Sequence, residues 1–115
     1  MAKHFVANVS DVERGTMKAF KVNGNKILVV NLEEGIFATD AKCPHLGAPL
    51  EKGKILDNCR IQCKFHRAEF DIKTGTAEKW ANFPPGIQAL NFVRGQKNLA
   101  IHNCSVEEDK IFVVM

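Results

Sequence analysis

Two short motifs pair a cysteine with a histidine, and they constrain this chain more than any other feature of its sequence. The first motif is Cys43-Pro44-His45 and the second is Cys63-Lys64-Phe65-His66, with residues 46–62 between them. Thiolates and imidazoles are ligands of transition metals. Two loops that each supply one ligand of either kind can converge on a single metal centre. The fold of this chain must therefore hold the two loops close together.

The ligand types leave two kinds of centre open. Mixed cysteine and histidine ligands occur in tetrahedral zinc sites and in one class of 2Fe–2S cluster, where two cysteines bind one iron and two histidines bind the other. A structural zinc finger usually places its cysteines together in sequence and its histidines together. Here each motif contains one cysteine and one histidine, which favours the iron–sulfur arrangement. A structural zinc module is the alternative.

The composition is that of an ordinary globular domain. A chain of 115 residues is long enough for one domain with its own core. The formal net charge is +3 and the basic residues are scattered, so we expect no nucleic-acid partner. No apolar run approaches the roughly 20 residues of a membrane helix, and the N-terminal residues lack the apolar core of a secretion signal. We expect a cytoplasmic monomer without a membrane span.

The hydrophobic pattern predicts an antiparallel β-protein. Asn23-Gly24 predicts a tight hairpin turn, because both residues accept positive φ angles. Pro84-Pro85-Gly86 predicts a rigid loop, and residues 87–93 are ambiguous because their apolar residues recur every three positions. The expected strands cover residues 5–9, 17–22, 26–32, 36–39, 54–56, 60–62, 70–73, 99–104 and 111–115.

The cysteines and histidines outside the two motifs have simpler interpretations. Cys59 and Cys104 lie within predicted strands, where an unligated cysteine usually behaves as a small hydrophobic residue. His102 also lies in a predicted strand and is expected to be a structural histidine, and His4 a surface or packing residue. Trp80 is expected to pack beside the two loops.

The two cysteine–histidine motifs and the residues around them resemble the Rieske ferredoxins. The resemblance is close over about residues 40–85 and looser in the flanking strands. The resemblance implies an all-β fold, a Rieske-type antiparallel β-sandwich with a small cluster-binding subdomain. We expect one domain over residues 1–115, with base strands in about 1–39 and 87–115 and the cluster-binding subdomain in about 40–85. The matching residues are Cys43-Pro44-His45-Leu46-Gly47-Ala48-Pro49-Leu50, Cys63-Lys64-Phe65-His66, Phe70-Asp71 and Thr74-Gly75.

The resemblance also implies a cofactor and a function. The cofactor is a Rieske-type 2Fe–2S cluster with Cys43, His45, Cys63 and His66 as ligands, and Pro84-Pro85-Gly86 would cover it from a third side. The implied function is one-electron transfer between a reductase and a terminal oxygenase or other oxidoreductase. The chain is too short for the additional catalytic domain of Rieske oxygenases, so we expect an electron carrier without catalytic residues.

An alternative within the same family is a fixed subunit of a larger oxidoreductase, similar to the small subunit of an assimilatory nitrite reductase. Members of that group often lack cluster ligands, and the intact ligand set here weighs against it. Residues 86–97 are longer than the corresponding link in the shortest ferredoxins. We expect them to form a core-packing turn, with a partner-docking insertion as the alternative.

The ligand set and its neighbours predict the reduction potential. Two thiolates leave the oxidised cluster formally neutral, whereas four would make it a dianion, so Rieske potentials lie higher, at about −150 to +300 mV. Ala48 and Phe65 stand where high-potential relatives have a disulfide. Arg67 and Ala68 follow His66 without a serine, and Phe70 replaces a tyrosine that would donate a hydrogen bond to sulfur. We predict a low-potential centre and a solvated Arg67.

Overall fold

The computed structural model describes residues 3–43, 49–64, 68–79 and 98–114, and nearly all regular structure in them is β. The prediction of an all-β antiparallel fold is confirmed. The described elements are β1 (Lys3–Asn8), η1 (Val9–Asp11), β2 (Met17–Val22), β3 (Asn25–Leu32), β4 (Gly35–Asp40), η2 (Leu50–Lys52), β5 (Lys54–Leu56), β6 (Arg60–Gln62), β7 (Glu69–Asp71), β8 (Ala77–Lys79), β9 (Ile101–Glu107) and β10 (Lys110–Val114), where η marks a short 3-10 helix.

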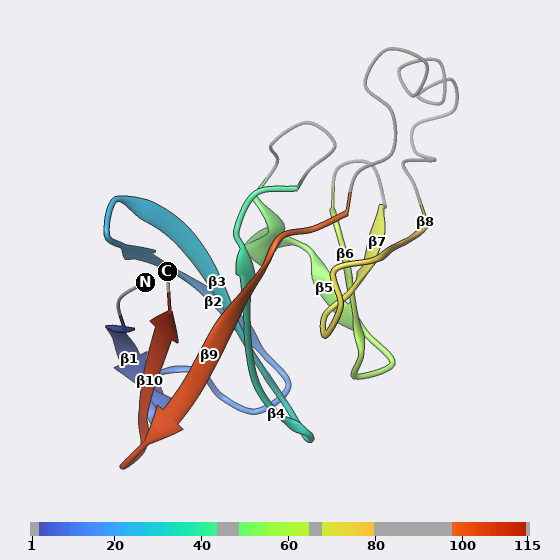
Figure 1. Ribbon diagram of the computed structural model, residues 1–115. Helices are drawn as coiled ribbons and strands as arrows, with labels where there is room; N and C mark the ends of the chain where they lie inside the picture. The colour runs from blue at the N-terminus through green and yellow to red at the C-terminus, as the bar shows by residue number, and fades with distance from the viewer. Residues whose placement is uncertain (1–2, 44–48, 65–67, 80–97, 115) are drawn as a thin grey trace.

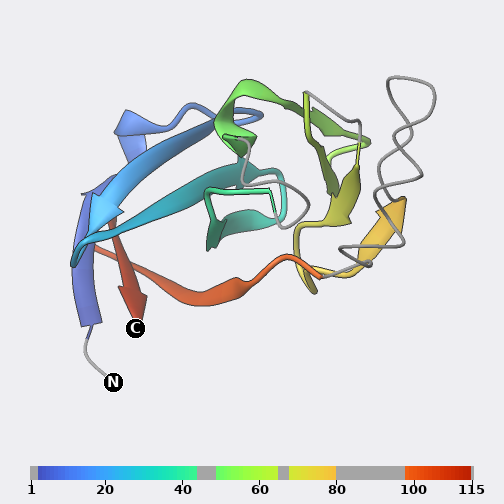
Figure 2. The same cartoon turned by 90° about the horizontal axis from the view of Figure 1, so that it is seen from above.

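The strands form two antiparallel sheets that lie side by side (Figure 1). The larger sheet has the order β1-β10-β9-β4-β3-β2, and the smaller has the order β5-β6-β7-β8. Figure 2 shows the two sheets from above, with the smaller one beyond one end of the larger. The division into a base and a cluster-binding subdomain with the predicted boundaries stays a prediction, because residues 80–97 lie outside the described residues.

Tight turns with positive φ angles connect the hairpins, as the sequence predicts. Asn23 and Gly24 between β2 and β3 have φ angles of 50° and 82°. Glu108 and Asp109 between the paired strands β9 and β10 have φ angles of 51° and 63°. The turn between β5 and β6 corrects one prediction: Cys59 lies in this turn rather than in a strand, because its N–H donates a hydrogen bond to the Leu56 carbonyl 3.0 Å away.

Strand β3 is buried on both faces, which explains its continuous apolar run. Successive side chains of a strand point to opposite faces. Leu28, Val30 and Leu32 join the cluster that also contains the small sheet and both motif cysteines. Ile27 and Val29 belong to two further clusters that contain Val113 and Ile111 of β10. One face of β3 therefore packs with residues of the small sheet, and the other face packs with residues of β10 in its own sheet.

Several predictions concern parts of the chain outside the described residues. They are the loop Pro84-Pro85-Gly86, the ambiguous residues 87–93, the role of residues 86–97 and the packing of Trp80. Strand β8 was not predicted, because its three residues show no apolar alternation. Within the described ranges, no helix has the length and apolar character needed to span a membrane.

Candidate metal centre

The two motif cysteines come from different sheets and meet in one buried cluster. Cys43 follows β4 and is 2% exposed, and Cys63 follows β6 directly and is fully buried. Both belong to the main core cluster, together with Leu50 of η2 and Ile61 of β6. The structure thus brings together two of the four predicted ligands. The other two, His45 and His66, lie outside the described residues, so the complete ligand set stays a prediction.

Backbone contacts fix both ends of each motif loop. At the first loop, Lys42 and Pro49 form an antiparallel bridge, and the Leu50 N–H donates to the Ala41 carbonyl at 2.9 Å. At the second loop, the Cys63 N–H donates to the Ala68 carbonyl at 2.8 Å. Main-chain hydrogen bonds of this kind hold a loop at a defined separation of its ends. The positions of both cysteines are therefore set by the sheets and not by the loops alone.

The surroundings of the two cysteines suit an iron–sulfur cluster. Thiolates are the soft ligands that iron–sulfur clusters require, and an apolar shell excludes water from the sulfurs. Ala68 and Phe70 are fully buried in the same hydrophobic core as Cys43 and Cys63. Neither side chain carries a hydroxyl group, so neither can donate a hydrogen bond to sulfur. The described residues thus fit a cluster of the low-potential kind.

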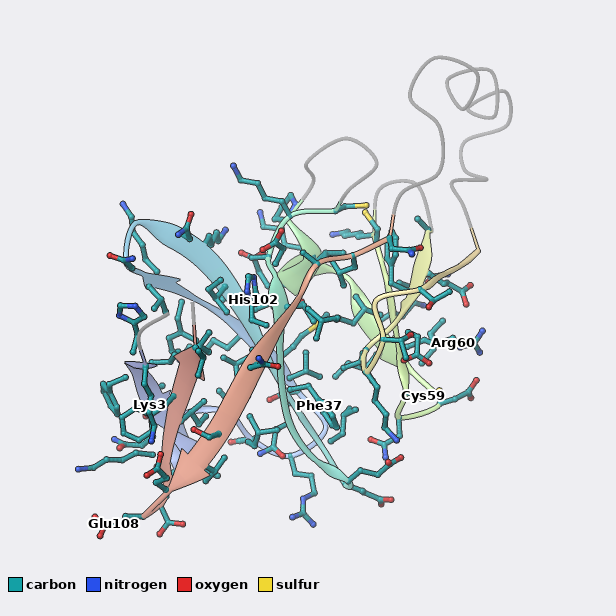
Figure 3. All side chains as sticks on the ribbon, viewed as in Figure 1. Lys3, Phe37, Cys59, Arg60, His102 and Glu108 are labelled. Atoms are coloured by element: carbon teal, nitrogen blue, oxygen red, sulfur yellow. The ribbon has the colours of Figure 1, made fainter. Side chains whose placement is uncertain are left out.

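A buried carboxylate lies on the outer side of the small sheet, directly after the second loop. The side chain of Glu69 is 7% exposed. One carboxylate oxygen accepts a hydrogen bond from Arg60 Nη1 at 3.0 Å, and the other accepts from Gln62 Nε2 at 3.4 Å. Arg60 Nη2 also donates to Asp57 at 2.6 Å. Figure 3 shows Arg60 on the side of the small sheet that faces away from the larger sheet.

This ion pair ties the strand after the second loop to the strand before it. Neither Glu69 nor Arg60 is among the site residues predicted from the sequence. The signal was present, because Arg60-Ile61-Gln62 and Glu69-Phe70-Asp71 both alternate polar and apolar residues, with a cation in the first triplet and two carboxylates in the second. In the sheet, Gln62 is directly opposite Glu69, and Ile61 is opposite Phe70. The polar face therefore carries the ion pair while the apolar face packs into the core.

Replacement of Arg60 by methionine is expected to lower the melting temperature more than Asp57→Asn does. The reason is that this change removes the guanidinium that pairs with the buried Glu69 carboxylate, and removing one partner of a buried ion pair is costly. Thermal denaturation of the cluster-loaded protein measures this effect. The double variant Arg60→Met with Glu69→Met should regain most of the lost stability. A double variant as unstable as the sum of the single variants would contradict this coupling.

A second ion pair links the larger sheet to the segment after the first loop. Lys26 Nζ of β3 lies 2.6 Å from a carboxylate oxygen of Glu51 in η2. Burial raises the pKa of Glu51, but the hydrogen bond from Lys26, a backbone hydrogen bond and nearby lysine charges outweigh it, so this pKa lies below its ordinary value of 4.5. A lowered pKa in the folded state means that the ionised carboxylate stabilises the fold.

This ion pair predicts a dependence of stability on acid pH. The stabilisation is present above pH 4.5 and is lost as the pH falls through the lower pKa of the folded state. We expect Lys26→Gln to destabilise the protein modestly at pH 7 and to have a smaller effect at pH 3. Urea denaturation at several pH values measures both differences. An effect of Lys26→Gln that is the same at pH 3 and pH 7 would contradict the assignment.

The cysteines and histidines outside the motifs have structural surroundings. His102 Nε2 in β9 lies 2.7 Å from Asp40 Oδ1, which confirms its interpretation as a structural histidine. Cys104 is a free thiol packed against two apolar clusters, and burial raises its pKa. This confirms its interpretation as a small hydrophobic residue. Cys59 is also a free thiol, in the β5–β6 turn.

Comparisons with known proteins agree with this site. A family model described as the Rieske [2Fe-2S] domain matches residues 2–94. Human apoptosis-inducing factor 3 is 33% identical over 94% of this chain, which corresponds to 16% of that protein. The ferredoxin component of the naphthalene 1,2-dioxygenase/salicylate 5-hydroxylase systems of Ralstonia sp is 37% identical over 62% of this chain and 67% of its own length. The structure of Sphingomonas yanoikuyae B1 ferredoxin superposes with a TM-score of 0.78 at 26% identity and covers 99% of both chains.

The fold and the paired cysteine segments define a small iron–sulfur domain of the ferredoxin type. The chain belongs to the Rieske [2Fe-2S] domain family, so its cofactor is a Rieske-type 2Fe–2S cluster. The predicted family and cofactor are both confirmed. The chain spans 16% of the length of the human relative, in which the matched segment is a small part of a longer protein.

Proposed function

We propose that this protein is a one-electron carrier that passes electrons from a reductase to a terminal oxygenase or a similar oxidoreductase. The observation that carries the proposal is that Cys43 and Cys63 belong to the same buried hydrophobic core in a Rieske-family fold. The name of the Ralstonia relative, a ferredoxin component of an oxygenase system, supports the kind of partner. We propose no catalytic residues, so the protein acts as a component of an oxidoreductase system and not as an enzyme by itself.

We propose Cys43 and Cys63 as ligands of one iron, with His45 and His66 as ligands of the other. The cluster, when bound, supplies one-electron oxidation and reduction. The chain contributes two buried thiolates, fixed loop ends and an apolar shell that excludes water. The two histidines lie outside the described residues, and their role rests on the motif spacing.

The purified protein tests this function directly. We expect a red-brown protein with iron and acid-labile sulfide in equal amounts, about two of each per chain. We expect a midpoint potential below about +100 mV, within the lower part of the family range, because Ala68 and Phe70 offer no hydroxyl donors. Voltammetry of the loaded protein measures the potential. A colourless protein with bound zinc and no sulfide would establish the structural zinc module instead.

We further propose a monomer in the cytoplasm. Size-exclusion chromatography of the loaded protein should give the mass of a single chain, 12.8 kDa. Fractionation of the source cells should recover the protein with other cytoplasmic proteins. A stable dimer would contradict the proposed monomer. Recovery in another compartment would contradict the proposed cytoplasmic location.

A fixed module within a larger oxidoreductase is the second candidate. It is favoured by the match to human apoptosis-inducing factor 3, which covers 94% of this chain but 16% of the longer protein. The two candidates differ in how the protein is recovered from its source. A carrier is recovered alone and exchanges between partners, whereas a fixed module is recovered in a stable complex with a larger subunit through several chromatographic steps.

A further inference from the structure

Three exposed lysines surround one hollow of the surface beside the second motif. The hollow has a volume of about 710 Å³. Its lining comes from the end of η2, the Gly53 connection, both ends of β5, the last residue of β6 and the residue after Cys63. Lys52, Lys54 and Lys64 all line it, and all three are exposed. The surface next to the proposed ligand Cys63 is therefore strongly basic.

This hollow lies directly against the segment that carries Cys63. Lys64 is the next residue in the chain, and Gln62 before Cys63 also lines the hollow. Gly53, which also lines the hollow, packs so closely against Gln62 that a Cβ atom there would lie 2.0 Å from the Gln62 carbonyl oxygen. The backbone that carries Lys52 and Lys54 thus touches the backbone that leads to Cys63. Near the other motif, Lys42 precedes Cys43 and is also exposed.

Lys52 interacts electrostatically with its neighbour Glu51, whose carboxylate is paired with Lys26. The ion pairs there engage other lysines, such as Lys26 with Glu51. The buried Glu69 pairs with Arg60 on the outer face of the small sheet. Among the described residues, none forms an ion pair with Lys42, Lys52, Lys54 or Lys64. With respect to the described residues, these four cations are available to a partner.

We infer that the lysine hollow formed by Lys52, Lys54 and Lys64 is the docking surface for a redox protein whose own electron-transfer site is surrounded by carboxylates. The inference rests on the electron-transfer function proposed above and adds the charge of the partner. Unlike charges on two approaching surfaces speed association and orient the partners. A basic surface beside Cys63 would bring an acidic partner close to the proposed cluster site. At physiological ionic strength such charges act over about 8 Å, so the position of the lysines next to Cys63 matters.

Two kinds of probe test the inference on the cluster-loaded protein. The target variant combines Lys52→Gln, Lys54→Gln and Lys64→Gln. The control variant combines Arg14→Gln, Lys18→Gln and Lys110→Gln, three exposed cations of the larger sheet and its connections, so that both variants lose the same formal charge. Stopped-flow spectroscopy measures oxidation of the reduced protein by the anion ferricyanide and by the cation hexaammineruthenium(III). Calorimetry measures binding of an octaglutamate peptide and of a single-stranded DNA octamer at low ionic strength.

In the target variant we expect the ferricyanide rate to fall by roughly threefold or more, the hexaammineruthenium rate to rise, and glutamate-peptide binding to be lost. The control variant should change each quantity much less. Equal changes in both variants would overturn the inference, because only net charge would then matter. A response to ferricyanide without peptide binding would also overturn it, as would tighter binding of the DNA octamer than of the peptide. Unchanged visible spectra and potentials in both variants separate these outcomes from a failure of the proposed function, which would show as the absence of the 2Fe–2S chromophore.

Discussion

Replacement of Cys63 by alanine is expected to abolish the visible chromophore of the purified protein completely. Cys63 is fully buried in the core cluster that also contains Cys43, and alanine offers no ligand atom in its place. An iron that loses one of two thiolate ligands is not held in a Rieske cluster. Cys43→Ala should have the same effect. Iron and sulfide analysis together with the visible spectrum measures the loss.

The chain supplies matched controls for this prediction, because it contains two further cysteines. Cys59→Ala changes a cysteine in the β5–β6 turn, and Cys104→Ala changes one in β9 that packs against apolar clusters. Both variants should keep the full chromophore and the full iron content. Loss of iron from either control with retention in the Cys63 variant would refute the proposed ligand set. Because a bound cofactor stabilises the folded state, the Cys63 and Cys43 variants should also melt at lower temperature.

The second large effect is expected at Gly75, where the small sheet meets the segment that returns to the larger one. Gly75 has a φ angle of 79°, and a Cβ atom there would lie 2.0 Å from the Leu99 carbonyl oxygen. Its N–H donates to the Asp71 carbonyl at 2.8 Å, and its own carbonyl accepts from the Leu99 N–H at 2.7 Å. Gly75→Ala must therefore displace backbone that is hydrogen-bonded on both sides. We expect a loss of about 3 kcal/mol or more in the free energy of unfolding.

Gly15 provides the control, since its φ angle of 84° is almost the same and no atom lies within 4 Å of the Cβ position. Gly15→Ala should cost only the strain of a left-handed conformation, about 1–2 kcal/mol. Denaturant unfolding of both variants in the loaded state gives the two values. The difference between them isolates the close approach of Gly75 to Leu99. Equal losses in the free energy of unfolding at the two positions would contradict this, because the contact between residue 75 and the Leu99 carbonyl would then relax without cost.

Much of the fold could be predicted from local sequence signals. Residues 17–22, 54–56 and 60–62 form strands with the predicted bounds, because their polar–apolar patterns and flanking turn residues agree. The Asn23-Gly24 turn follows from the tolerance of both residues for positive φ. Strand β8 could not be predicted in the same way, since its pairing with β7 and not its own pattern makes it a strand. Cys59 was misplaced because the turn after Leu56 extends by one residue beyond Asp57 and Asn58.

Some features of the predicted metal centre also follow from local sequence, and others depend on the tertiary structure. The two motifs and their spacing predict a cluster with two cysteine ligands, and the family and its cofactor are confirmed. The predicted absence of hydroxyl donors at Ala68 and Phe70 also needs only the sequence. The sequence could not predict three other features. These are the burial of both cysteines in one hydrophobic core, the ion-pair partner of Glu69 and the lysine hollow.

The sequence by itself determined the chemistry of this protein, because ligand identity and spacing are local properties of the chain. Only the tertiary structure decided which cysteines share a core and which charges stay available to a partner. Cys43 follows a strand of the larger sheet and Cys63 follows a strand of the smaller one, so their meeting depends on how the sheets pack. Likewise, Arg60 neutralises Glu69 across two strands, whereas Lys52, Lys54 and Lys64 surround the hollow without an ion pair among the described residues. Such contacts join segments far apart in sequence, and packing of the whole chain selects them.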